Sequence, residues 1–336
     1  MTDEVSQAPD RWQALWARWK HAVAAASFAA GIASFALIER QERVAQALVI
    51  LVPLSWLLAA LEPALLRMAE RRGRWRVPPW LMGYAAQALH QECLFFTLPF
   101  FYATTAWASP QLAFTATMTV LALVSIADPI YYRQVLPRRA AVWAFHAISG
   151  SITVLTAAPM LWHLTTSQSF GLALLCLGVV SIPAWRALLR GVPLRSALAL
   201  ALSAGLMWVA WQARVAVPPA SLWVADMRIT ASIDAAARAP GVDLGEIAAA
   251  DLQAHGIYAW SSIRVPRGLR ERIEHHWRFN GRTVDVVALD VQGGREAGYR
   301  AWSHKTAFPA DPRGDWEVRV VTQSGQLIGR TGFTVR

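Results

Sequence analysis

The chain has 336 residues, of which 55% are hydrophobic and only 16% are charged. About a quarter of the residues in an ordinary soluble domain are charged, so this composition argues against a one-piece soluble enzyme. It also excludes a disordered chain, because disorder requires low hydrophobicity. The net charge of +10 would suit a protein that binds nucleic acid or an anionic surface, unless the charges have another purpose.

The charged residues are unevenly distributed along the chain. Residues 1–213 contain 16 Lys or Arg and 9 Asp or Glu, whereas the shorter stretch 214–336 contains 16 and 13. The second part has the charge density of a soluble domain and the first does not. We therefore expect a membrane domain over residues 1–213, a linker over 214–221 and a small soluble domain over 222–336.

Apolar runs recur along the first part, and each approaches the length of about 20 residues that a membrane-spanning helix needs. They predict a polytopic α-helical bundle of about seven spans, at roughly 21–38, 44–66, 80–107, 111–127, 140–162, 168–185 and 195–213.

Basic residues alternate between the two ends of these predicted spans. With the N-terminus in the cytoplasm, the cytoplasmic segments contain 14 Lys or Arg, while the opposite loops contain only Arg40 and Arg43. Positive residues favour the cytoplasmic side of a membrane. We therefore expect an inner-membrane protein of a bacterium with its C-terminal domain in the periplasm. The positive charge then orients the helices, so we expect no nucleic-acid partner.

Polar residues interrupt two of the predicted spans. Gln87, His90 and Gln91 share one face of the third span, whereas Glu92 is turned to the opposite side. His146 lies at a similar depth in the fifth span. Ionisable groups inside a membrane are costly and are candidates for function. They could instead hydrogen-bond between helices, or a haem or metal ion could lie between His90 and His146.

Strand-like segments follow the linker, and two of them flank Asn280-Gly281. Alternating apolar and polar residues on both sides of Asn-Gly are a strong hairpin signal, and a second hairpin is expected around residues 323–326. We expect Trp277 and Trp316 in the core. The segments predict an immunoglobulin-like antiparallel sandwich, with strands at about 222–232, 256–265, 272–279, 282–291, 297–308, 315–322 and 327–335.

Trp and Gly residues recur in order through the C-terminal part, in His276–Gly281, Tyr299–Thr306, Gly314–Val318, Gly325–Leu327 and Phe333–Val335. This part resembles the bacterial domain of unknown function 2914. The membrane part resembles the domain of unknown function 5924, which precedes it. The resemblance implies the two-part architecture and no established activity.

Four residues of one predicted strand are candidates for ligand binding: Arg300, Trp302, His304 and Lys305. Arginine can bind a carboxylate or phosphate through two hydrogen bonds, and tryptophan offers a large apolar ring. Arg300, Trp302 and His304 alternate, so they point the same way. The alternative is that the aromatic residues of this domain only pack in its core.

These patterns favour a non-enzymatic inner-membrane protein that displays a periplasmic β domain for binding or scaffolding. The expected partners are the lipid bilayer and an envelope protein or glycan, and no cofactor is expected. One alternative is an intramembrane enzyme or redox or metal protein that uses Gln87, His90, Glu92 and His146. Another is a transporter or channel gated by the β domain.

Overall fold

The structure is a computed structural model that describes Ala22, Ala29 and residues 79–295 and 297–336. The chain forms two compact units. The first contains the described residues up to Pro99, Ala116–Val154 and Ala173–Trp208. The second contains Phe100–Thr115, Leu155–Leu172 and Val209–Arg336, so it combines the β strands with two helix–loop–helix segments.

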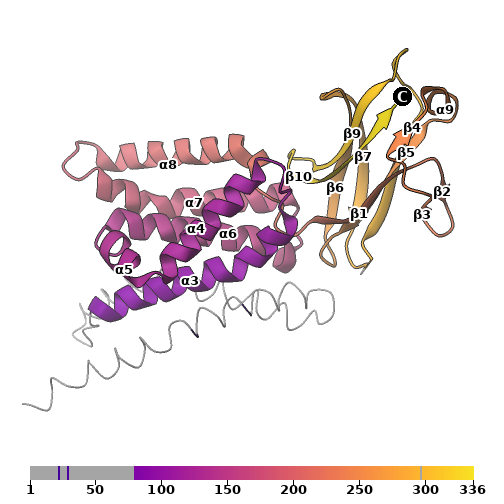
Figure 1. The fold of residues 1–336 in the computed structure, drawn as a ribbon. Helices are drawn as coiled ribbons and strands as arrows, with labels where there is room; N and C mark the ends of the chain where they lie inside the picture. Colours follow the sequence, from indigo (N-terminus) through magenta and orange to yellow (C-terminus); the bar gives the residue numbers. More distant parts are fainter. Residues whose placement is uncertain (1–21, 23–28, 30–78, 296) are drawn as a thin grey trace, which may run out of the picture. The chain divides into compact units, whose positions relative to one another are not determined.

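Long apolar helices make up the chain between residues 79 and 212 (Figure 1). Pro129 occupies the first turn of a short helix, where that helix itself needs no N–H from it. The helices are α3 (Pro79–Thr104), α4 (Gln111–Ile126), α5 (Asp128–Ile130), η1 (Tyr131–Val135), α6 (Arg139–Trp162), α7 (Thr166–Leu188) and α8 (Arg195–Gln212).

The prediction of about seven spans is wrong. Among the described residues, three helices are long and apolar enough to cross a membrane: Arg139–Trp162, Thr166–Leu188 and Arg195–Ala216. A fourth is added only if Gln111–Ile126 and Asp128–Val135, which are bent by 86°, form one broken span. The predicted spans at 21–38 and 44–66 lie outside the described residues.

The predicted spans at 80–107 and 111–127 do not qualify as membrane-crossing helices on their own, for two physical reasons. The polar residues Gln87, His90, Gln91 and Glu92 interrupt α3, and this 26-residue helix is not among those that are apolar enough to cross a membrane. Helix α4 has only 16 residues, fewer than the roughly 20 needed for a crossing. Apolar composition alone therefore overstated the number of spans.

The strands between Trp223 and Val335 form what we call the β domain. A three-stranded sheet has the order β1-β5-β8, a five-stranded sheet has the order β4-β10-β9-β6-β7, and β2 pairs with β3. A short helix, α9 (Ala249–His255), precedes β5. The strands are β1 (Trp223–Thr230), β2 (Ile233–Asp234), β3 (Ala239–Pro240), β4 (Glu246–Ile247), β5 (Ile257–Arg264), β6 (Arg270–Phe279), β7 (Arg282–Gln292), β8 (Tyr299–Lys305), β9 (Gly314–Thr322) and β10 (Leu327–Val335).

Both predicted hairpins are confirmed. Asn280 and Gly281 connect β6 to β7 with φ angles of 48° and 81°, the left-handed pair that a tight type I′ turn requires. Strands β9 and β10 form the second antiparallel pair. The short parallel pairing of β4 with β10 departs from the fully antiparallel arrangement that we expected. The β-rich part is consistent with the predicted sandwich, while its immunoglobulin-like identity stays a prediction.

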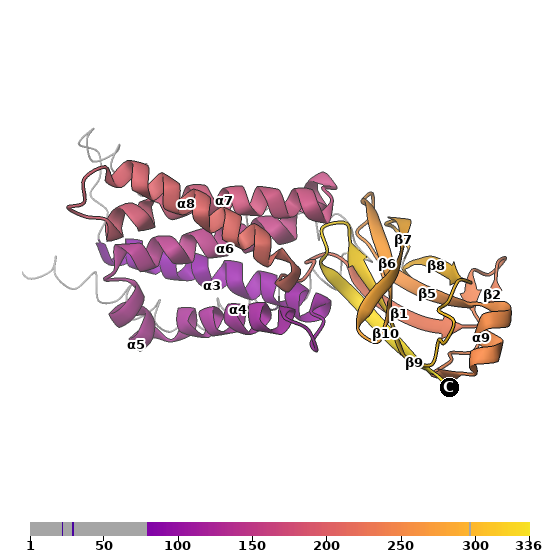
Figure 2. The same ribbon diagram turned by 90° about the horizontal axis from the view of Figure 1, so that it is seen from above.

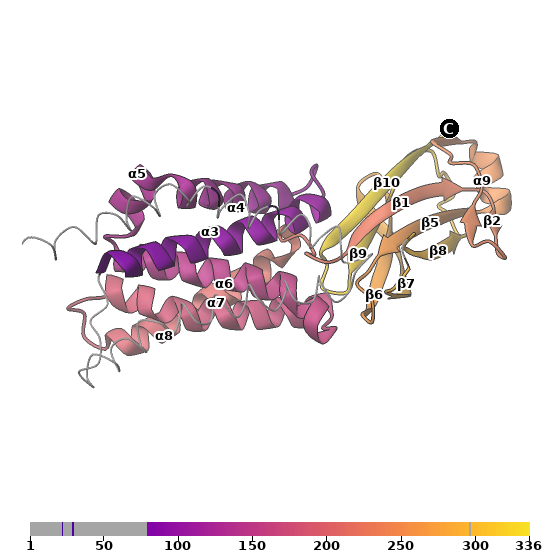
Figure 3. The same cartoon turned by 90° about the horizontal axis from the view of Figure 1, so that it is seen from below.

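Two apolar clusters form the core of the β domain. One contains Ile263 from β5 with Ile273 from β6, and the other contains Ile257 from β5 with Trp277 and Trp316. Because each cluster draws on both sheets, the sheets pack face to face, as Figures 2 and 3 show from two sides. Both tryptophans are buried, as predicted.

Candidate functional site

Two histidines from separate helices meet in the first unit. His90 Nε2 on α3 lies 2.5 Å from His146 Nδ1 on α6, and the Tyr131 hydroxyl lies 2.9 Å from His90 Nδ1. All three side chains are buried. Each ring nitrogen either donates or accepts depending on the tautomer, so the three groups form a continuous hydrogen-bonded chain. The structure thus brings together His90 and His146, as their depths suggested.

The glutamines of the same helix face compensate for a break in the neighbouring helix. Pro129 has no N–H, so the Ser125 carbonyl four residues earlier loses its helical donor. Gln91 and Gln87 donate to that carbonyl at 2.7 and 3.0 Å, and Gln87 also donates to Asp128 at 2.9 Å. This part of the polar cluster therefore has a structural purpose, whereas the His90 contacts are not needed for it.

The geometry of the two histidines does not suit a metal or haem between them. A direct contact at 2.5 Å uses the facing nitrogens for a hydrogen bond with each other. Between residues 79 and 336, leaving out residue 296, no group of three or more His, Cys, Asp or Glu is placed to hold a metal ion. Glu92 is only half-buried, in keeping with its expected position away from His90.

The structure separates the four binding candidates of β8 into two groups. Arg300 and Trp302 are half-buried and His304 is exposed, while the alternating residues Ala301 and Ser303 are buried. The prediction that Arg300, Trp302 and His304 share a face is therefore confirmed. Lys305 lies on the opposite, buried face of the strand and does not belong with them.

Arginine and aromatic side chains interleave on this outer face. The Arg238 guanidinium lies 5.2 Å from the Trp302 ring centre and 5.3 Å from that of Tyr299. Trp260 donates to the Arg238 carbonyl at 3.0 Å, and Arg300 donates to the Ala237 carbonyl at 2.8 Å. We call the side chains on this side of the smaller sheet the β8 face: Arg238, Tyr258, Trp260, Arg300, Trp302 and His304.

The accessible end of the β8 face is a stacked pair. The rings of Tyr258 and His304 are nearly parallel, at 7°, with centres 3.9 Å apart. Strand pairing places them opposite each other on β5 and β8. Sequence reasoning missed Tyr258, Trp260 and Arg238, because the pairing of β5 with β8 cannot be read from either strand alone. The alternation of Tyr258 and Trp260 on β5 was the only local signal.

Lys305 has a structural partner on the inner face. Its ammonium group contacts the Asp285 carboxylate on β7 at 2.8 Å, with the Lys305 side chain 6% exposed. The hydrogen bond from Lys305 lowers the pKa of Asp285 below its usual value, although partial burial opposes this shift. Lys305 therefore has its charge compensated within the fold.

A third buried histidine, His275, lies between the two sheets. His275 Nε2 is 3.0 Å from the Ser261 hydroxyl, and His275 Nδ1 is 2.9 Å from the Ser303 hydroxyl. Trp277 donates to the same Ser303 oxygen at 3.1 Å. Burial lowers the pKa of His275 to about 4, with a smaller contribution from His276. His275 is thus a neutral, fully hydrogen-bonded core residue.

Within the second unit, side chains connect the β domain to the helix–loop segments. Glu271 accepts hydrogen bonds from the N–H and the hydroxyl of Thr166, at 2.6 and 2.8 Å. Gln111 donates to the Leu327 carbonyl at 2.8 Å. Burial raises the pKa of Glu271, and the two hydrogen bonds from Thr166 oppose that rise. No sequence signal pointed to these contacts.

Comparison with known proteins gives two family matches. The model of the "Family of unknown function (DUF5924)" matches residues 2–259, and that of the "Protein of unknown function (DUF2914)" matches residues 270–335, which confirms both resemblances. No curated protein and no solved structure matches the chain. The first match ends inside β5, so both segments contribute strands to the smaller sheet. The chain therefore belongs to the family of unknown function DUF5924, and its last strands carry a DUF2914 segment.

Proposed function

We propose that the protein is a membrane-anchored binding protein that holds its β domain outside the bilayer, opposite its arginine-rich loops. The loops at 105–110 and 163–165 contain no Arg or Lys. The other ends of the same helices are rich in arginine, which favours the cytoplasmic side. Helix α8 leads from that arginine-rich side into the β domain. The arginines are Arg133, Arg138, Arg139, Arg186, Arg190 and Arg195.

This arrangement supports a location in a bacterial inner membrane with the β domain in the periplasm. The division into a membrane part up to residue 213, a linker over 214–221 and an outer domain from 222 belongs to the same proposal. The contacts of Gln111 with Leu327 and of Thr166 with Glu271 support a β domain that is held against helix ends and not on a free tether.

The β8 face is the proposed binding surface, and the stacked pair of Tyr258 and His304 is the observation that carries it. On the same face of β8, flat rings can stack on a sugar, and the Arg300 guanidinium further along the strand can bind a carboxylate. Envelope glycans and envelope proteins offer both groups. The half-exposed guanidinium and the exposed imidazole leave donors within reach of such a ligand.

Site-specific crosslinking in cells tests this function. A photoreactive phenylalanine analogue replaces His304 in the full-length protein, and the control places it at Val286, 49% exposed on β7 of the other sheet. We expect discrete crosslinked products from position 304 only, which disappear when Arg300→Ala is added. Products of equal yield from both positions, or none from position 304, would contradict the proposed surface.

The chain Tyr131–His90–His146 favours a second candidate, transfer of protons within the membrane. If Tyr131 donates to His90 Nδ1, the proton on His90 Nε2 is directed at His146 Nδ1, so one shift moves the Tyr131 proton to His90 and a second moves a His90 proton to His146. The transfer is complete when His146 releases its extra proton to water on one side and Tyr131 takes up a proton from water on the other. When a membrane potential is imposed on proteoliposomes that contain the protein, the pH of their lumen should change. The His90→Phe variant should abolish this change. Cys176→Ser is the control. Equal rates for His90→Phe and wild type would exclude this candidate.

A further inference from the structure

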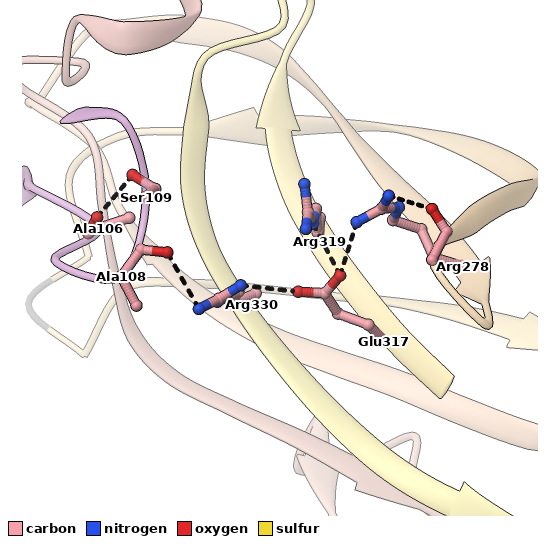
Figure 4. Close-up of polar contacts among 8 residues, drawn as sticks. Ala106, Ala108, Ser109, Arg278, Glu317, Arg319 and Arg330 are labelled. Atoms are coloured by element: carbon pink, nitrogen blue, oxygen red, sulfur yellow. Dashed lines mark hydrogen bonds and ion pairs between the residues drawn. The ribbon is translucent and has the colours of Figure 1, made fainter. Parts of the chain in front are cut away.

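Three arginines surround one carboxylate on the outer face of the larger sheet (Figure 4). Glu317 on β9 accepts from Arg278 Nη1 and Arg319 Nε, both at 2.9 Å, and from Arg330 Nη1 at 3.2 Å. Arg278 donates in addition to the Gly281 carbonyl. We call these four side chains the Glu317 cluster. It takes no part in the β8 face, which belongs to the other sheet.

The Glu317 cluster carries an excess of positive charge that the fold does not neutralise. Arg319 and Arg330 are direct partners in the register of β9 and β10. Like charges in this position destabilise a sheet. Within the cluster, one carboxylate offsets three guanidinium groups, so a net charge of about two positive units remains on these four side chains. The Glu274 carboxylate on β6 contacts His276, which faces Arg319, and it reduces this excess from one side without contacting the three arginines. An anion would offset the charge that remains.

Glu317 orients the arginines while leaving donors available. Burial alone raises the pKa of Glu317, but the hydrogen bonds and charges of Arg319, Arg278 and Arg330 outweigh it and lower the pKa. Glu317 thus stays ionised. Arg319 is bound to it through Nε, and one of its terminal nitrogens points away from the carboxylate (Figure 4). A guanidinium fixed in this way loses little conformational freedom on binding a second anion.

A further contact of the cluster places it beside an aromatic loop of the same unit. Arg330 Nη2 donates to the Ala108 carbonyl at 3.2 Å, between α3 and α4 (Figure 4). Nearby, the rings of Tyr102 and Trp107 lie 5.5 Å apart and are 42% and 50% exposed. Exposed Trp and Tyr at helix ends mark the interface between membrane and water, where lipid phosphates lie.

We propose that Arg278, Arg319 and Arg330 form a binding site for the phosphate of an anionic phospholipid headgroup. Arginine binds phosphate through two parallel hydrogen bonds, which the outward-facing donors can supply. The site rests on the membrane anchoring proposed above but not on the β8 face. Failure of the crosslinking at position 304 would therefore leave it intact.

Lipid retention by the full-length protein tests this site. Wild type in a neutral detergent is titrated with phosphatidylglycerol, with phosphatidylcholine and with inorganic phosphate, and bound ligand is counted by native mass spectrometry. We expect binding of phosphatidylglycerol to be about tenfold weaker in Arg319→Gln, because charge-assisted hydrogen bonds are lost. Arg319→Lys should be affected less. Arg313→Gln is the matched control, since Arg313 is 70% exposed and pairs with Asp311.

The outcomes separate the sources of the phosphate group. Preference for phosphatidylglycerol over both other ligands, lost in Arg319→Gln and kept in Arg313→Gln, would support the site. Equal binding of phosphatidylcholine, or equal lipid binding by Arg319→Gln and wild type, would overturn it. Inorganic phosphate that binds as tightly as the lipid would overturn the lipid assignment. Unchanged melting temperatures show that each variant is folded.

Discussion

Glu271 on β6 accepts two hydrogen bonds from Thr166, one from its backbone N–H and one from its hydroxyl. Thr166 is the first residue of α7, where N–H groups lack helical acceptors. A carboxylate also interacts favourably with the positive end of a helix. The contact therefore satisfies the start of a long apolar helix with a side chain from the β domain.

Glu271→Ala should lower the free energy of unfolding by about 2 kcal/mol, because buried donors of Thr166 lose their acceptor. Glu271→Gln should cost less, since its amide oxygen still accepts. Thermal unfolding of the purified full-length variants in detergent measures both. A smaller effect for Glu271→Ala than for Glu271→Gln would show that the contact contributes nothing.

The same residue makes stability depend on pH. Because burial raises the pKa of Glu271 in the folded protein, the folded state holds its proton more tightly than the unfolded state. The contribution of Glu271 to the free energy of unfolding is therefore largest below the ordinary glutamate pKa of about 4.3. It falls as the pH rises through the pKa that Glu271 has in the folded protein. Melting curves across this range should show that the wild type loses more stability with rising pH than Glu271→Gln. If wild type and Glu271→Gln lose stability equally as the pH rises, the pKa of Glu271 is not raised in the folded protein.

His275 should act in the opposite direction. Its pKa of about 4 is below the ordinary histidine value, since burial disfavours the charged ring. The stability that it contributes is complete above pH ~6.5 and is lost as pH falls towards the folded-state pKa. The loss in wild type, relative to His275→Gln, should reach at most about 3 kcal/mol. His255→Gln, at an exposed position on α9, is the control and should follow the wild-type profile.

Lys305 and Asp285 provide a test of an ion pair with one buried partner. Asp285→Ala leaves the Lys305 ammonium without its carboxylate, and we expect a loss of about 2 kcal/mol of stability. Asp285 is 42% exposed, so solvent reduces the cost. Adding Lys305→Met should restore most of the loss by removing the charge. Chemical denaturation of the variants measures this, with Asp290→Ala as control. If the double variant Asp285→Ala/Lys305→Met is less stable than Asp285→Ala alone, the Lys305 charge is not the cause of the loss.

Local patterns predicted the parts of the fold that depend on local chemistry. Asn280-Gly281 fixed a turn that needs two left-handed residues, and alternation placed Trp277 inside and Arg300, Trp302 and His304 on one face. The same alternation separates Lys305 from His304, because adjacent residues of a strand point to opposite faces.

Features that depend on contacts between distant segments could not be predicted. Tyr258 meets His304 only because β5 pairs with β8, and Arg330 meets Glu317 and Ala108 only through the packing of the second unit. The number of spans was overestimated for a different reason. A long apolar run does not by itself make a span, because polar residues interrupt α3 and because α4 ends after 16 residues.

The side of the membrane on which the β domain lies is the central claim, and cysteine accessibility tests it most directly. Cys93 and Cys176 are replaced by alanine, and single cysteines are introduced by Arg313→Cys in the β domain or Arg190→Cys between α7 and α8. Both arginines are exposed. In intact spheroplasts, a membrane-impermeant maleimide should label position 313 at once and position 190 only after permeabilisation. Labelling of position 190 with protection of position 313 would contradict the account.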